Sequence, residues 1–95
     1  MSDKVLDVIK PGVVTGDDYQ KLLAIAKKNE YALPAVNVVN TNSVNAVIEA
    51  AKVVNSPVMI QFSNGGGIFY AGKGLSNENQ QAAIAGTISG AMHVH

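Results

Sequence analysis

The chain has 95 residues, of which 47% are hydrophobic, and its seven basic residues balance its seven acidic ones. All seven basic residues are Lys, so the sequence offers neither a strong net field nor the bidentate Arg contacts that favour nucleic acid. The absence of Cys excludes a disulfide framework and a thiolate metal site. No apolar run reaches the roughly 18 residues that span a bilayer, and residues 1–4 lack the apolar core of a signal peptide. We therefore expect one cytoplasmic domain with no nucleic-acid or membrane partner.

The first third of the chain predicts one amphipathic helix. Residues 5–9 are apolar but short, and Pro11 and Gly12 end them. Thr15 and Asp18 have the Ser/Thr-x-x-acid spacing of a helix start. Apolar residues then recur at i, i+3, i+4 and i+7, namely Tyr19, Leu22, Leu23 and Ala26. We expect a helix whose last turn lies at residues 27–29.

Two strands are predicted, at residues 32–39 and 58–62. Both are apolar on successive positions, as in a parallel sheet that is covered on both faces. Residues 40–43 offer capping side chains for a helix that runs to about Val54. Another helix is expected from Gln80, with one apolar face formed by Ile84, Ile88, Ala91 and Met92. Two strands with helices cannot cover both faces of a parallel sheet, so we expect the start of a larger α/β domain.

A glycine-rich stretch follows the second strand directly. Five glycines lie within residues 65–74, interrupted by large apolar residues that a flexible linker would lack. We predict a ligand-side loop, neither helix nor strand, at the carboxyl end of a strand, where α/β proteins build their sites. Residues 67–73 match the first seven positions of a phosphate-binding P-loop, but Gly74 stands where Ser or Thr is required.

Polar residues occupy positions where the strand pattern favours apolar ones. Asn37 lies within the first strand, and Gln61 and Ser63 lie two apart at the end of the second. We interpret these three as a polar pocket above the sheet; the alternative is that each only bonds to nearby backbone. His93 and His95 are two positions apart, which on a helix makes a poor metal pair. No catalytic residue or metal ligand is assigned in this segment.

Five motifs, in order along the whole chain, resemble the amino-terminal part of class II fructose-bisphosphate aldolases. They are KPGVVTGDD (10–18), ALPAVNVV (32–39), QFSNGG (61–66), YAGKG with Ser76 and Asn77 (70–77), and GAMHVH (90–95). The combination of SNGG and AGKG is specific, whereas the apolar runs are not. Gly67 stands where the family is expected to carry a small residue such as Ala.

The resemblance implies that residues 1–95 are the amino-terminal fragment of a single (β/α)8 TIM-barrel domain, comprising two βα units and the start of the third helix. It implies a homodimeric, zinc-dependent lyase that reversibly cleaves fructose 1,6-bisphosphate into dihydroxyacetone phosphate and glyceraldehyde 3-phosphate. Ser63 and Asn37 match family positions that contact substrate, and Gln61 matches a position that lines the same pocket. The zinc ligands and the catalytic acid–base group are expected beyond residue 95.

Two alternatives remain open from the sequence. A close relative could act on tagatose 1,6-bisphosphate, and a non-enzymatic small α/β binding module would need these residues to fold alone. A barrel of this kind needs about 250 residues. We therefore expect the 95-residue chain by itself to be inactive.

Overall fold

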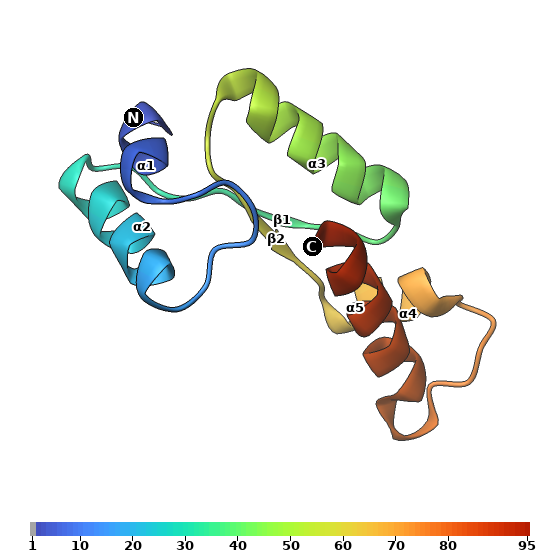
Figure 1. Cartoon of the computed structure of the whole chain (residues 1–95). Helices are drawn as coiled ribbons and strands as arrows, with labels where there is room; N and C mark the ends of the chain where they lie inside the picture. Colours follow the sequence, from blue (N-terminus) through green and yellow to red (C-terminus); the bar gives the residue numbers. More distant parts are fainter. Residues whose placement is uncertain (1) are drawn as a thin grey trace.

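The computed structural model describes residues 2–95, with side chains described from Val5 onward. The elements, in chain order, are α1 (Ser2–Val8), α2 (Gly16–Lys28), β1 (Ala35–Asn37), α3 (Thr41–Val54), β2 (Met59–Gln61), α4 (Asn64–Ala71), the 3-10 turn η1 (Glu78–Gln80) and α5 (Gln81–Val94). The two strands cross the centre of Figure 1, with α1 and α2 at one end and α4 and α5 side by side at the other. The predicted alternation of strands and helices is confirmed. The short apolar segment at residues 5–9 turns out to belong mainly to a helix.

The strands form a two-stranded parallel sheet, as predicted. Asn37 on β1 pairs with Gln61 on β2, and α3 provides the crossover between the strands. Each strand is only three residues long, so the sheet is shorter than the predicted strands at residues 32–39 and 58–62. Parallel pairing places the carboxyl ends of both strands at one edge, which fixes where a site can be built.

The start of α3 is closed by a reciprocal pair of hydrogen bonds. The Asn40 side chain accepts from the Ser43 backbone N–H at 2.8 Å, and the Ser43 hydroxyl accepts from the Asn40 backbone N–H at 3.0 Å. This capping satisfies amides that have no partner within the helix and confirms the prediction for residues 40–43. The prediction for Thr15 is only half right: it is the N-cap of α2, but its side chain makes no capping hydrogen bond.

The predicted loop over the glycine run is wrong for residues 64–71, which form α4. Glycine is a poor helix former, so local propensity argues against this helix. The reason lies in its packing against α5. A Cβ built on Gly67 would lie 2.5 Å from the Thr87 hydroxyl oxygen, and one built on Gly86 would overlap the Gly67 carbonyl oxygen. The glycines therefore allow two helix backbones to come into direct contact, and the true loop is confined to residues 72–77.

Two further glycines allow these helices to pack closely against the sheet and the segment that follows it. A Cβ on Gly66 would lie 2.9 Å from the Val38 carbonyl oxygen, just after β1, and one on Gly90 would overlap the Phe62 ring. The Phe62 ring also packs edge-on against Tyr70, with ring centroids 6.0 Å apart. The position of α4 is thus defined on one side by β1 and on the other by α5. Residues 67–71, which lie in the segment that only partly matches a P-loop, are helical.

Buried apolar side chains are few. Val5, Ile9 and Leu22 form one cluster between the first two helices, and Val38 and Val44 are fully buried beside the sheet. The accessible surface is 6509 Å². A compact protein of this mass would expose about 5,200 Å². The described elements therefore leave much of their apolar surface uncovered.

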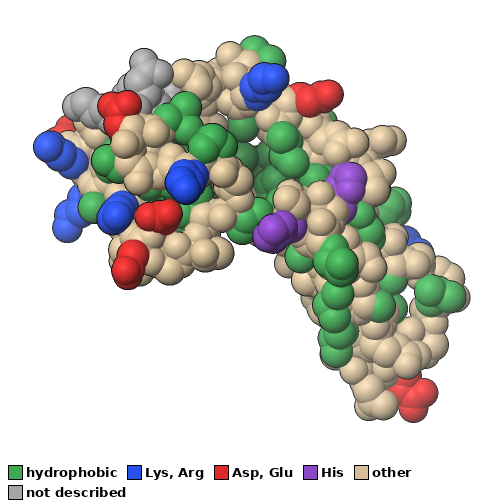
Figure 2. All heavy atoms as spheres, in the orientation of Figure 1, with side chains coloured by type: hydrophobic (Ala, Val, Ile, Leu, Met, Phe, Trp, Pro, Cys, Tyr) green, Lys and Arg blue, Asp and Glu red, His purple; other side chains and the backbone are tan. Residues whose placement is uncertain are grey.

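The apolar face predicted for α5 is one of these uncovered surfaces. Ile84, Ile88 and Met92 are 54%, 56% and 74% exposed. Figure 2 shows a ridge of hydrophobic side chains along this helix, while charged side chains gather over the half of the molecule formed by α1 and α2. α5 packs on α4 through its small residues instead, because Ala82, Ala83, Gly86 and Gly90 are buried. None of the helices in the described part of the chain is long and apolar enough to cross a membrane.

The close approach of α4 and α5 predicts a coupled effect at Gly67 and Thr87. Gly67→Ala should lower the free energy of local opening of these helices by about 1–3 kcal/mol, because the new methyl group overlaps the threonine hydroxyl. Adding Thr87→Ala should restore part of the loss. Amide hydrogen exchange of the two helices measures both effects. Gly74→Ala is the control, since nothing lies within 4 Å of a Cβ there. Equal exchange in the Gly67 and Gly74 variants would contradict the packing argument.

Candidate functional site

The carboxyl ends of the two strands carry a pair of interacting amide side chains. Gln61 Nε2 donates to Asn37 Oδ1 at 2.6 Å, and both residues are exposed. They are register partners, so they lie on the same face of the sheet. Two of the three residues of the predicted polar pocket are therefore in contact at the sheet edge. Each amide keeps further hydrogen-bonding capacity beyond this bond, since an amide offers two N–H donors and an oxygen with two lone pairs.

Ser63 lies beyond the end of β2 and is the N-cap of α4. Its backbone is extended, with φ −76° and ψ 166°, and its hydroxyl oxygen accepts from the Gly66 backbone N–H at 2.9 Å. A serine hydroxyl that accepts one bond can still donate its proton to another group. The bond to Gly66 is a bond to nearby backbone of the kind that the alternative interpretation of Ser63 allowed, and it leaves the hydroxyl proton available to a ligand.

A hollow of about 330 Å³ lies beside Ser63, between the start of α4 and one side of α5. Its lining mixes amide and hydroxyl groups with apolar side chains: Phe62, Ser63, Asn64, Gln80, Ala83, Ile84, Thr87 and Ile88. Asn37 and Gln61 do not line it. The three predicted site residues therefore divide between a pair at the sheet edge and a serine that opens onto the neighbouring hollow.

Sequence reasoning missed the amide groups that surround Ser63. Asn64 Nδ2 donates to Gln80 Oε1 at 3.2 Å, and Asn77 Nδ2 donates to the same oxygen at 3.3 Å. The adjacency of Asn64 to Ser63 could have flagged Asn64. No local pattern could have flagged Gln80, because it lies 16 positions along the chain from Asn64 and reaches it only through the packing of α5 on α4.

The two histidines lie at the end of α5. His93 is within the helix, as predicted, and its Nε2 lies 3.0 Å from Asn45 Oδ1 on α3, while His95 follows the last helical residue. The His93 contact links α3 to α5. Among the described residues, no group of three or more His, Cys, Asp or Glu side chains could hold a metal ion.

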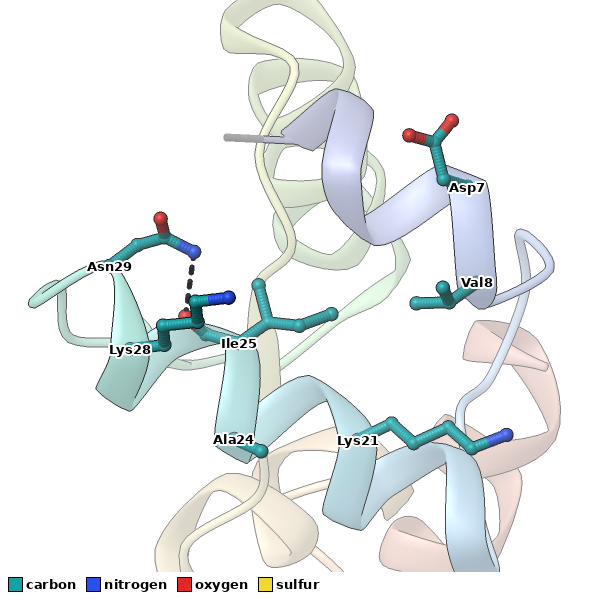
Figure 3. Close-up of a pocket in the computed structure, with 7 residues that line it drawn as sticks. All are labelled: Asp7, Val8, Lys21, Ala24, Ile25, Lys28 and Asn29. Carbon is teal, nitrogen blue, oxygen red and sulfur yellow. Dashed lines mark hydrogen bonds between the residues drawn. The ribbon is translucent and has the colours of Figure 1, made fainter.

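A second hollow lies elsewhere, between α1 and α2. It measures about 510 Å³ and is lined by Asp7, Val8, Lys21, Ala24, Ile25, Lys28 and Asn29. Figure 3 shows Val8 and Ile25 pointing toward each other from the two helices, with Lys21 and Asp7 directed away from the space between them. The only hydrogen bond drawn there joins Asn29 Nδ2 to the Ile25 carbonyl oxygen, which closes the end of α2. No set of convergent polar groups marks this hollow, so size alone does not make it the site.

Comparison with known proteins identifies the family. The family model described as fructose-bisphosphate aldolase class-II matches residues 17–95, and the chain belongs to that family. The resemblance inferred from the sequence motifs is confirmed.

Its relatives match nearly all of this chain but only part of their own length. The fructose-bisphosphate aldolase of Edwardsiella ictaluri is 60% identical over 92 residues, which is 97% of this chain and 26% of that protein. The class 2 fructose-bisphosphate aldolase of Escherichia coli is 59% identical over 93 residues, again 26% of its length. A crystal structure of the Campylobacter jejuni fructose-bisphosphate aldolase superposes with a TM-score of 0.87 at 58% identity, over 96% of this chain and 25% of that one. The chain thus spans about a quarter of these relatives.

Proposed function

We propose that this chain forms the amino-terminal quarter of a fructose-bisphosphate aldolase and supplies part of its substrate-binding surface. The reaction is the reversible cleavage of the C3–C4 bond of fructose 1,6-bisphosphate. The C4 hydroxyl loses its proton as C4 becomes the aldehyde of glyceraldehyde 3-phosphate. The electron pair of the broken bond passes to C3 of the dihydroxyacetone phosphate half, and C3 then takes up a proton, so that one proton is lost and one is gained overall. The observation that carries the proposal is 59–60% identity to named aldolases over 97% of the chain.

The site geometry supports a binding role for Ser63. A bisphosphate is strongly anionic, and a hydroxyl that donates to an anionic oxygen makes a charge-assisted hydrogen bond. The first amides of a helix have no partner within the helix, so the start of α4 adds backbone donors next to Ser63. Ser63 would therefore contact a substrate oxygen while its own oxygen stays fixed by Gly66.

Asn37 and Gln61 are proposed as substrate-binding residues from the neighbouring sheet edge. Their mutual hydrogen bond orients both amides, because Asn37 Oδ1 is occupied by the Gln61 donor. The Asn37 amide nitrogen is then left to donate to a hydroxyl or carbonyl oxygen of the sugar. Neutral amides suit this part of the ligand, since they can select the position of an uncharged sugar oxygen by hydrogen-bond geometry without adding charge.

The uncovered surface supports completion of the domain as a (β/α)8 barrel. Both sheet faces in such a barrel are covered by neighbouring elements, whereas Val36 on β1 and the apolar ridge of α5 are exposed here. The radius of gyration is 15.1 Å, compared with about 12 Å for a compact domain of this length. These features favour a portion of a larger fold over an independent binding module.

Zinc is the metal that the family resemblance implies, and the described residues do not fit it. They include no Cys and no cluster of three candidate ligands. We propose that the ligands belong to the part of the relatives that this chain does not span. A homodimeric, cytoplasmic enzyme is proposed on the same family grounds.

The proposal can be tested in a chimaera in which residues 1–95 replace the matched segment of the Escherichia coli relative. We expect this chimaera to cleave fructose 1,6-bisphosphate. Ser63→Gly within it should lower kcat/KM by roughly ten- to a hundredfold, the effect of losing one hydrogen bond to a charged group. Glycine is chosen because it weakens an N-cap by only a few tenths of a kcal/mol. Steady-state kinetics and a thermal melt measure the two effects separately.

A matched control for Ser63 is available in the following loop. Ser76 Oγ accepts from the Glu78 backbone N–H at 3.2 Å, so Ser76→Gly removes a hydroxyl with a similar bond to nearby backbone, away from the proposed site. This variant should leave kcat/KM unchanged. If Ser63→Gly also leaves kcat/KM unchanged, Ser63 serves only as a helix cap. An inactive chimaera that folds and retains zinc would overturn the proposed function itself.

The 95-residue chain by itself should neither cleave fructose 1,6-bisphosphate nor retain stoichiometric zinc, because its described side chains provide no ligand set. Elemental analysis after dialysis, together with a coupled aldolase assay, measures both. A value near one zinc per chain would contradict the expectation.

His93 and His95 should have no catalytic role in the chimaera. His93→Gln preserves a side chain that can donate to Asn45, so it should leave zinc content and turnover within about twofold of the parent. His95→Gln should behave alike. The measurement is metal content and kcat for each variant, and loss of metal in either one would show that a histidine of α5 is a ligand.

A further inference from the structure

Gln80 occupies a backbone conformation that its side chain does not favour. It has φ +62°, and Asn79 directly before it has φ +56°. Two successive non-glycine residues in the left-handed region are uncommon, and such conformations persist only where surrounding contacts hold them. At Gln80 these contacts are two hydrogen bonds made by the side chain and one that the backbone N–H donates to the Asn77 carbonyl oxygen at 3.0 Å.

The Gln80 side chain joins the start of α4 to the start of α5. Its Oε1 accepts from Asn64 Nδ2 at 3.2 Å and from Asn77 Nδ2 at 3.3 Å. Asn77 in turn accepts from the Ala83 backbone N–H at 3.0 Å. A backbone N–H can only donate, which makes the Asn77 oxygen the acceptor and its nitrogen the donor. The orientation of the Gln80 amide follows, with its oxygen toward both asparagines.

The hydrogen bond from Asn64 to Gln80 lies at the turn of α4 that has the lowest helix propensity. The first turn of α4 contains Gly65, Gly66 and Gly67, and glycine is among the poorest helix formers. Asn64 is the residue directly after Ser63, so a hydrogen bond that holds Asn64 also restrains the turn that carries the Ser63 hydroxyl. Both residues line the same hollow as Gln80.

We propose that Gln80 is a positioning residue for substrate binding: it fixes the first turn of α4 through Asn64 and thereby sets the orientation of Ser63. This inference rests on the proposed function. It assigns Gln80 no contact with the reacting atoms. Loss of its side chain should weaken substrate binding more than turnover, because the Ser63 turn becomes mobile while the reacting groups are untouched.

The test uses the chimaera with Gln80→Gly. Glycine adopts positive φ without strain, so the thermal melt should not fall. KM should nevertheless rise by about two- to tenfold, the effect of one lost neutral hydrogen bond, with kcat changed less than about twofold. Gln81→Met is the matched control. It removes a glutamine hydrogen bond of the same kind, from Gln81 Nε2 to the Ser76 carbonyl oxygen at 3.2 Å, without a link to α4. Its KM should equal that of the parent.

A double-mutant cycle with Asn64→Ala shows whether Gln80 acts through Asn64. The two substitutions together should raise KM no more than the larger single effect, because both break the same bond. Additive effects would overturn the route through Asn64. An active chimaera whose KM is unchanged in Gln80→Gly, or whose kcat falls in step with its melting temperature, would overturn the inference as a whole. An inactive parent chimaera would instead count against the proposed function.

Discussion

The contact between the backbones of α4 and α5 is the constraint on which the rest of the structure depends. Gly67 and Gly86 meet so closely that a methyl group at either position would collide with the opposite helix. Glycine lowers helix stability by roughly 1 kcal/mol per residue relative to alanine, so α4 relies on this docking to exist. The position of α4 then decides where Ser63 lies, and the geometry of the site follows from packing at a distance from it.

The sequence predicts the parts of the fold that local rules control. The Asn40–Ser43 cap, the apolar periodicity of α2 and the parallel pairing that brings Asn37 beside Gln61 all follow from residues close in the chain or from topology. The glycine run does not, because its local propensity favours a loop and only the partner helix reverses that preference. The family was identified from the motifs, whereas the barrel and the substrate contacts remain proposals.

The site residues illustrate the same division between local and long-range information. Asn37 and Ser63 attract attention because polar residues are unusual in a strand of the apolar type. Gln80 is polar in a polar loop and gives no such signal. Its proposed positioning role rests on a hydrogen bond that spans 16 positions and that exists only because α5 returns alongside α4. The local sequence pattern does not predict that bond, whereas the folded structure places Asn64 and Gln80 in the lining of one hollow.

The first turn of α4 also bears on the chemical durability of the protein. Asn64 is followed by Gly65, a dipeptide that in a flexible chain deamidates readily, when the glycine nitrogen attacks the asparagine side-chain carbonyl. A helical backbone disfavours that attack, and the Asn64 amide is held by Gln80. The packing of α4 against α5 therefore protects Asn64 from deamidation. If the turn opened, the product would carry a carboxylate next to Ser63, and this negative charge would repel an anionic ligand.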